Sequence, residues 1–353
     1  MLGNINHIVT FRCNLKCGMC LFHKLSQDDA LVSQELSTEE WIKHLDILPK
    51  CDMITISGGE PFLREDLDRL VLAAIEKNNH LYLNTNGILT RKLEELLLKL
   101  DDVALLSKIT IIISLDGAKQ ETHDKIRGVK GAWVAATKSL QLLCDLDVSR
   151  EVTMVIQQDN YLEIYDLYQL GRTWNVNPGF QMVLPGADFS TSQMNEIYWQ
   201  LKRVWEDIDD PGYEYYLRGS LYRQIYGKRP LPCYLGNTGE EDIDSELIRS
   251  PLIDPIGNVY PCGNAPWIKQ IEDWMPKDYG YPELVMGNIQ DTPLMDIIQS
   301  NRTREVLDRI DSANCDWCWA SCSIEPTFRH LQTLTEEEVT KIDRLSNSHR
   351  ADE

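Results

Sequence analysis

The chain has 353 residues, which is enough for one large α/β domain with an appendage or for two medium domains. Hydrophobic residues make up 43% and charged residues 25%, so enough apolar surface exists to offset the entropy of ordering, and a disordered chain is excluded. The formal net charge of −20 argues against nucleic acid and anionic membrane surfaces as partners, because the sequence contains no basic patch to attract them.

The sequence predicts a cytoplasmic protein. It contains no apolar run of about 18 residues, and its amino terminus lacks the cationic lead and cleavage site of a secretory signal. Most of its ten cysteines fall into two regions, and close spacing in a reducing compartment indicates metal binding rather than disulfides. Cys51 and Cys144 stand apart in apolar settings and are interpreted as core thiols.

Through the first half of the chain, short β-branched runs alternate with amphipathic stretches. Strands are predicted at residues 8–11, 53–57, 80–85, 108–116, 150–156 and 179–186. Helices are predicted at residues 38–48, 64–77, 92–100, 132–146 and 161–173, the first opened by a capping box of Ser37 and Glu40. Strands separated by helices pair in parallel, so we expect an open doubly wound sheet or a barrel, and periodicity does not choose between them.

The character of the chain changes after the sixth predicted strand. Residues 193–229 read as an aromatic, charged helix, and a region rich in Gly and Pro with five cysteines follows. We therefore expect four parts: an α/β core at 1–190, a helical linker at 191–229, a loop-rich metal-binding domain at 230–328 and a terminal helix or tail at 329–353.

Three cysteines follow the first predicted strand within eight residues, namely Cys13, Cys17 and Cys20. Three thiolates on an iron–sulfur cluster leave one iron without a protein ligand, and an open iron is a site for chemistry. The alternatives are a zinc ion or a ferredoxin-like electron carrier, although spacings of three and two residues match neither of their usual patterns.

This cysteine spacing resembles that of the radical S-adenosylmethionine (radical SAM) superfamily. Residues 57–61, Ser-Gly-Gly-Glu-Pro, close the second predicted strand and are similar to the family segment that binds the methionine end of S-adenosylmethionine (SAM). The resemblance implies that Gly58, Gly59 and Glu60 bind SAM, since glycines let a ligand approach the backbone and a carboxylate suits an ammonium. It also implies a partial (β/α)6 barrel that is open on one side.

The resemblance implies further cofactor contacts near the carboxyl ends of the predicted strands. Ser114, Asp116 and Arg127 lie in a segment similar to one in radical SAM enzymes with extra clusters, although Ser114 and Asp116 could equally cap the next helix. Met19 occupies a position that is usually aromatic in the family, so the adenine ring would contact a thioether here. Phe22 lies nearby and could supply the aromatic contact instead. Thr85 and Asn86 are expected to line the site, and Val155 and Ile156 could pack against the base or equally belong to the core.

The second cysteine region resembles the SPASM domain and its shortened twitch form, which hold auxiliary [4Fe–4S] clusters. Gly257 lies in an expected hairpin, and a helix leads into the last cysteines. Because two of the seven SPASM cysteines are missing, we expect one auxiliary cluster with four ligands. They are chosen from Cys233, Cys262, Cys315, Cys318 and Cys322, the last being least favoured. A structural zinc ion is the alternative. Trp317 and Trp319 could shield the cluster from water or equally be ordinary core residues.

The resemblance implies an oxidoreductase that cleaves SAM reductively to a 5′-deoxyadenosyl radical, abstracts hydrogen from a substrate and passes the remaining electron to the auxiliary cluster. A low-potential donor of the flavodoxin or ferredoxin type is expected. Because the sequence starts almost at its first strand, without room for a leader-binding domain, it favours oxidation of an alcohol or sugar-like natural product.

Two alternatives stay open. One is peptide or protein modification by a maturase, either of ribosomal peptides or of the sulfatase type. The other is a non-catalytic iron–sulfur or zinc scaffold. No catalytic residue is identified from the sequence, although the acidic stretch 240–244 could supply a base or be a solvated loop.

Overall fold

The computed structural model describes residues 4–20, 22–51, 53–77, 80–183, 188–208, 210–226, 250–263 and 284–312. Six parallel strands pair in the order of the chain. They are β1 (Asn4–Ile8), β2 (Met53–Ser57), β3 (Leu81–Thr85), β4 (Ile109–Ser114), β5 (Ser149–Ile156) and β6 (Gly179–Met182). A doubly wound sheet would reverse this order at a switch point, so the order identifies a barrel type of winding. Within the described residues β6 does not pair with β1, which confirms the predicted partial barrel.

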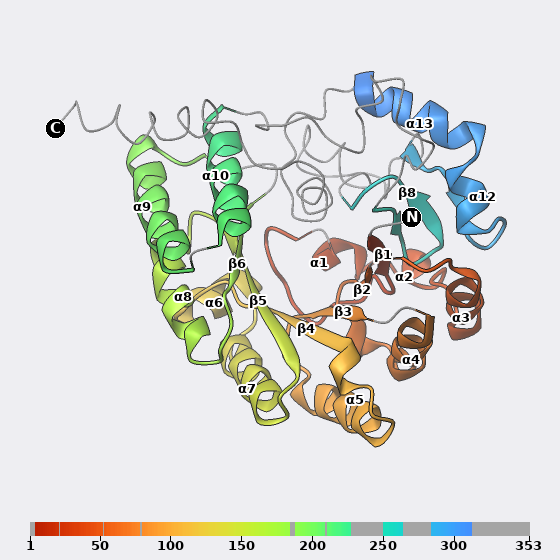
Figure 1. Ribbon diagram of the computed structural model, residues 1–353, viewed down its shortest axis with the longest axis horizontal. Helices are drawn as coiled ribbons and strands as arrows, with labels where there is room; N and C mark the ends of the chain where they lie inside the picture. The colour runs from red at the N-terminus through yellow and green to blue at the C-terminus, as the bar shows by residue number, and fades with distance from the viewer. Residues whose placement is uncertain are drawn as a thin grey trace.

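Eight described helices accompany these six strands, and five of them cover one face of the sheet. Their bounds are α1 (Phe22–Leu25), α2 (Asp29–Val32), α3 (Thr38–Ile47), α4 (Leu67–Lys77), α5 (Thr90–Asp102), α6 (Gln120–Arg127), α7 (Ala132–Asp145) and α8 (Ile164–Arg172). Figure 1 shows α3, α4, α5, α7 and α8 following one another around the outside of the sheet. The predicted capping box at the start of α3 is confirmed, since the Ser37 and Glu40 side chains each bond the other's backbone. α6 is an additional helix that the sequence reading does not predict.

The first strand lies earlier than predicted. The sequence places it at residues 8–11, whereas β1 spans Asn4–Ile8. Asn4 and Asn6 lie on the half-exposed face of the sheet, and asparagine is disfavoured in strands. His7 is a polar residue at a buried position, so it interrupts the alternation that marks a strand. After Val9, whose N–H still donates to Ser57 O, the backbone leaves the sheet and forms a loop.

The long aromatic helix predicted at 193–229 is two helices, α9 (Thr191–Ile208) and α10 (Pro211–Tyr226). Pro211 opens α10, as expected of a residue that cannot continue a helix but suits its first turn. The backbone N–H of Tyr213 donates to the Asp210 side chain, and that of Glu214 donates to the Asp210 carbonyl. These two bonds cap the start of α10. Among the described helices, none combines the length and the apolar character needed to cross a bilayer.

The chain returns to the barrel after residue 250. β7 (Leu252–Ile253) pairs in parallel with β1, then in a hairpin with β8 (Asn258–Tyr260), which pairs with β9 (Gly287–Asn288). The expected hairpin at Gly257 is confirmed, with a φ of 87° that favours glycine. α12 (Leu294–Ile298) and α13 (Asn301–Ser312) follow and share one apolar core with the barrel. The four domain boundaries given above stay predictions.

Candidate active site

The cysteine loop, residues 9–20, begins where β1 ends, at the carboxyl edge of the parallel strands. Backbone bonds join it to the segment after β2: Gly59 N donates to Thr10 O at 2.9 Å, and Glu60 N donates to Arg12 O at 2.8 Å. From the chain between α2 and α3, the Glu35 carboxylate accepts a hydrogen bond from Thr10 Oγ1 at 2.9 Å. These contacts fix the backbone directly before the first cysteine.

Gly58 and Gly59 lie against the cysteine loop. A Cβ atom built on Gly58 would be 2.8 Å from Thr10 O, and one on Gly59 would be 2.2 Å from Arg12 O. Both distances are shorter than a non-bonded contact allows. The two glycines therefore let the chain approach itself here, in addition to the ligand approach that the sequence predicts.

The three cysteines of the loop lie in a desolvated setting: Cys17 is buried, and Cys13 and Cys20 are half-buried. Burial raises the pKa of Cys13 to about 11, and the neighbouring Cys20, Glu60 and Cys17 raise it further. Burial also raises the pKa values of Cys17 and Cys20. The free thiols are therefore protonated at neutral pH, and a metal that takes them as thiolates must displace their protons.

The donor set of the loop fits an iron–sulfur cluster with three cysteine ligands. In the part of the chain that the structure describes, no three His, Cys, Asp or Glu side chains converge closely enough to hold one metal ion. A single zinc ion needs all of its sulfur ligands at a Zn–S distance of about 2.3 Å. An iron–sulfur cluster does not require such convergence, because each cysteine binds a different iron. Cys13, Cys17 and Cys20 would therefore hold a cluster with one iron open to a ligand.

Glu60 has no exposed surface. Its Oε1 accepts from Thr85 Oγ1 at 2.8 Å and Phe62 N at 3.1 Å, and its Oε2 accepts from Asn86 N at 2.8 Å. Burial raises its pKa to about 7 despite these bonds. Asn86 in turn donates to Asn14 Oδ1 at 2.8 Å, so the carboxylate is connected to the cysteine loop. Its predicted bond to the SAM ammonium stays a prediction.

The two residues predicted near adenine lie at the other end of the loop. Met19 is half-buried, and its Sδ accepts a hydrogen bond from Gln157 Nε2 at 2.9 Å, which connects the loop to the end of β5. Phe22 opens α1 and packs partly buried against two apolar clusters. Val155 lies on the half-exposed face of β5, whereas Ile156 is 1% exposed in the core on the helix side.

Asp116 and Arg127 form an ion pair, with Arg127 Nη2 2.7 Å from Asp116 Oδ2. Arg127 Nη1 also lies 3.9 Å from Cys17 Sγ, so the pair reaches a predicted cluster ligand. Ser114 ends β4 with its side chain half-exposed. The structure thus brings Arg127 to the cysteines and places Asp116 behind it.

Of the second cysteine region, the structure describes Cys262. This residue follows β8, is half-buried and packs against the main core. The other residues predicted to act in this region lie outside the described residues: Cys233, Cys315, Cys318, Cys322, Trp317, Trp319 and the acidic stretch 240–244. The number of auxiliary clusters and their ligands stay predictions.

The half-exposed face of the six parallel strands, called the open face below, carries mainly neutral polar side chains, with some apolar residues and one carboxylate among them. One row consists of Asn84, Ile112 and Glu151, and the next of Ser114, Thr153 and Gly179. Further positions on this face are Asn4, Asn6, Met53, Thr55, Ser57, Tyr82, Thr110, Ser149, Val155 and Gln181. None of these strand positions carries Lys or Arg, and Glu151 contributes a carboxylate.

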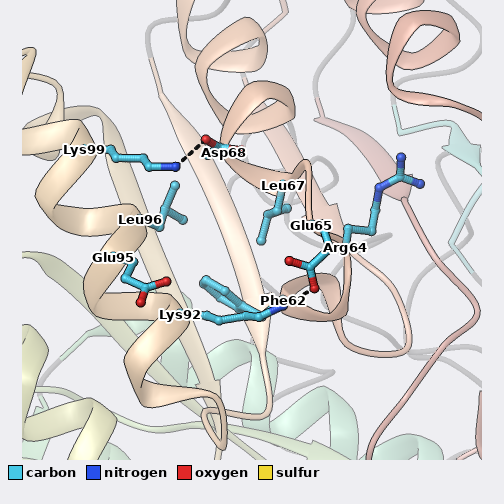
Figure 2. A pocket seen from close by; sticks show the side chains of 9 residues that line it. All are labelled: Phe62, Arg64, Glu65, Leu67, Asp68, Lys92, Glu95, Leu96 and Lys99. Atoms are coloured by element: carbon cyan, nitrogen blue, oxygen red, sulfur yellow. Dashed lines mark hydrogen bonds and ion pairs between the residues drawn. The ribbon is translucent and has the colours of Figure 1, made fainter.

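A groove on the helix side is not the site. It lies between α4 and α5, has a volume of about 90 Å³ and is crossed by ion pairs of Lys92 with Glu65 and Lys99 with Asp68 (Figure 2). Ligand pockets usually exceed about 300 Å³. The groove is too small for a nucleoside cofactor, and its charges already have partners.

Sequence reasoning missed several residues that build the site. Three of them hold the ends of strands: Glu35 at β1, Gln157 at β5 and Asn160 at β4. Asn160 Nδ2 donates to the carbonyls of Asp116 and Val155, both at 2.9 Å. Gln157 and Asn160 follow the end of β5 by one and four positions, and a polar residue just beyond a strand is only a weak indication of a functional site. Nothing in the sequence marks Glu35, because its partners are 24 and 25 residues away.

Two family models match this chain. The radical SAM superfamily model matches residues 7–170, and the SPASM model, described as an iron–sulfur cluster-binding domain, matches residues 247–323. The first match contains the cysteine loop, the Gly-Gly-Glu segment and the Asp116–Arg127 pair. The second contains β7 to α13 and four of the five later cysteines.

Among curated relatives, the antilisterial bacteriocin subtilosin biosynthesis protein AlbA of Bacillus subtilis is 34% identical over 46% of this chain and 35% of its own. This chain thus spans about a third of that relative. An AdoMet-dependent heme synthase of Methanosarcina barkeri is 28% identical over 82% of this chain and 80% of its own. PqqA peptide cyclase of Granulibacter bethesdensis is 26% identical over 79% of this chain and 72% of its own.

Among solved structures, Streptococcus suis SuiB bound to the precursor peptide SuiA has a TM-score of 0.60. It is 15% identical, over 88% of this chain and 66% of that chain. The likeness shows the fold of the barrel. A radical SAM domain uses a [4Fe–4S] cluster and SAM, and a SPASM domain binds auxiliary iron–sulfur clusters. On the two family matches and the geometry of the cysteine loop, the chain contains a radical SAM domain, matched over residues 7–170, and a SPASM domain toward its carboxyl terminus, matched over residues 247–323.

Proposed function

We propose that this enzyme modifies a peptide, as a maturase of ribosomal peptides or of a sulfatase-type protein substrate. The names of the relatives, which include a peptide cyclase and a bacteriocin biosynthesis protein, support this alternative better than the small-molecule oxidation that the sequence favours. With SAM bound, the cluster supplies reductive cleavage of SAM and abstraction of a hydrogen atom from the substrate.

The observation that carries the proposal is the chemistry of the open face. Asn84, Ser114 and Thr153 offer amide and hydroxyl groups that suit the N–H and C=O groups of a peptide backbone. The protein would bind and aim the peptide at this face, beside the cysteine loop, and exclude water from it.

A second candidate is heme synthesis, because the heme synthase relative covers 82% of this chain. Porphyrins of this type carry carboxylates, which proteins usually bind with Arg or Lys. The described strands offer neither residue type on the open face. The charge of this face therefore favours the peptide.

The test uses anaerobically reconstituted enzyme with SAM and a low-potential donor of the flavodoxin or ferredoxin type, which we include in the proposal. Two probes are compared: any short precursor peptide encoded beside the gene, and Fe-coproporphyrin III. We expect the peptide to stimulate 5′-deoxyadenosine formation at least tenfold and to lose two hydrogens by mass spectrometry. Stimulation by the porphyrin, with loss of carbon dioxide and no change in the peptide, would contradict the proposal.

A matched pair of variants links the result to the open face. Asn84→Ala should lower the affinity for the peptide about fivefold, since one hydrogen bond worth about 1 kcal/mol is lost. Glu94→Gln, on the outer helix α5, should have no effect. Equal effects of the two substitutions would show that the open face is not the peptide site.

A further inference from the structure

The carboxyl end of α6 is attached to the cysteine loop. Lys16 N donates to Arg127 O at 3.0 Å, which places the helix end beside the second cysteine. Gly128 caps the helix with a φ of 67°, and a Cβ atom there would be 2.7 Å from Lys16 O. This contact fixes the Arg127 backbone relative to the loop, so the direction of its side chain follows from the fold.

The Arg127 side chain lies between a buried carboxylate and a cysteine sulfur. Nη2 is 2.7 Å from Asp116 Oδ2, and Nη1 is 3.9 Å from Cys17 Sγ. The exposed fractions of the two charged side chains are 11% for Arg127 and 0% for Asp116. Asp116 is itself held, because its Oδ1 accepts from Val155 N at 2.9 Å and its N–H donates to His123 Nδ1 at 3.0 Å.

We propose that Arg127 is a positioning residue that sets the reduction potential of the cluster bound by Cys13, Cys17 and Cys20, with Asp116 as its counter-charge. A cationic donor beside a thiolate ligand stabilises the reduced, more negative cluster and therefore raises the potential. The carboxylate of Asp116 opposes this effect from the far side of the guanidinium. Because both side chains are shielded from water, their fields act with little screening.

The proposal depends on the cluster of the radical SAM domain and not on which substrate the enzyme uses. It goes beyond the predicted contact of Arg127 with SAM, because it concerns the cysteine ligand and applies without SAM. A purely structural role would predict that both charge-removing variants disturb the cluster in the same way. An electrostatic role predicts shifts of opposite sign.

The test is a redox titration of the full-length, reconstituted protein, followed by electron paramagnetic resonance without SAM. The variants are Arg127→Gln, Arg127→Lys and Asp116→Asn, with iron and sulfide content measured for each. At the wild-type midpoint, Arg127→Gln should lower the ratio of reduced to oxidised cluster about tenfold, a shift of about 59 mV for one electron. Asp116→Asn should raise the ratio, and Arg127→Lys should stay close to the wild-type value.

Shifts of the same sign for Arg127→Gln and Asp116→Asn, or no shift in either with full iron content, would overturn the proposal. If Arg127→Gln fails to hold iron, the reduction potentials of Asp116→Asn and Arg127→Lys still test the proposal. A lowered or unchanged potential in Asp116→Asn would then refute the proposal, and a raised one would support it.

Discussion

At the scale of single residues, Gly59 decides whether the cysteine loop can adopt its conformation. In Gly59→Ala the new Cβ would overlap Arg12 O, so the loop must move, at a cost of about 1–3 kcal/mol. We expect reconstituted Gly59→Ala to retain less than half of the wild-type iron at the first cluster. The measurement is iron and sulfide content together with the cluster's spectroscopic signal.

Gly18→Ala is the matched control, because Gly18 lies in the same loop and a Cβ atom there would meet no heavy atom within 4 Å. This variant should bind nearly as much iron as the wild type. An equal loss in both variants would mean that the loop tolerates no added atom anywhere, and wild-type iron in Gly59→Ala would show that the clash is relieved elsewhere.

The residues of the candidate site differ in how far the sequence reveals them. Cys13, Cys17 and Cys20 are local in sequence, so their spacing alone identifies a metal-binding loop. Glu60 is marked by its two preceding glycines, but two of the three partners of its carboxylate come from β3 and the following turn, 25 and 26 residues away. The contact of Arg127 with Cys17 joins residues 110 positions apart and requires the folded chain.

At the scale of helices and strands, β1 and α3 meet through two histidines. His7 Nε2 lies 3.3 Å from His44 Nε2, and the exposed fractions of these residues are 1% and 3%. Burial lowers the pKa of His7 to about 4 and lowers that of His44 as well. Both rings are therefore neutral in the folded protein at neutral pH.

This pair predicts acid-sensitive packing of α3 on β1. Between pH 6.5 and about 4, the unfolded chain binds protons that folded His7 does not, so the free energy of unfolding falls as pH falls. The loss for His7 is on the order of 3 kcal/mol across that window. We expect His44→Gln, which keeps a polar partner for His7 but does not titrate, to lose less stability on acidification than the wild type.

Urea unfolding at several pH values between 7 and 5 measures this difference. His23→Gln, a substitution of a half-exposed histidine on α1, is the control and should follow the wild-type curve. A His44→Gln curve parallel to the wild type would show that the pair does not control the pH dependence.

Element boundaries were predictable where strong local signals exist. β2 was placed correctly, and α3 and α7 were placed to within one residue at their ends. β1 lies earlier than predicted because Asn4 and Asn6 are poor strand formers and the buried His7 interrupts the alternation of apolar and polar residues. The break between α9 and α10 was signalled by Pro211 and could have been recognised from the sequence.

At the scale of the whole molecule, the sheet runs without interruption from the barrel into the second part of the chain. β7 extends the barrel through β1, and apolar residues of α12 and α13 join the same core. The sequence suggests a separate loop-rich unit because Gly and Pro are frequent there. Pairing of strands about 245 residues apart carries no local signal, which is why this continuity could not be predicted.

The charge of the whole molecule makes a prediction about electron delivery. The chain carries 55 acidic and 35 basic residues, so at low salt it repels an acidic protein donor. Arg12 and Lys16 are exposed on the cysteine loop, but two cations are few against a net charge of −20. Raising the salt from about 10 mM to about 150 mM shortens the screening length from about 30 Å to about 8 Å.

We therefore expect the rate of cluster reduction by a limiting acidic flavodoxin or ferredoxin to rise severalfold over this range of salt. The cationic radical of methyl viologen serves as the control, and its rate should fall, because the same field attracts it. Stopped-flow absorbance at each salt concentration measures both. A rate that falls with salt for the acidic protein donor would mean that the cations beside the cysteines, and not the charge of the whole chain, govern how the donor approaches.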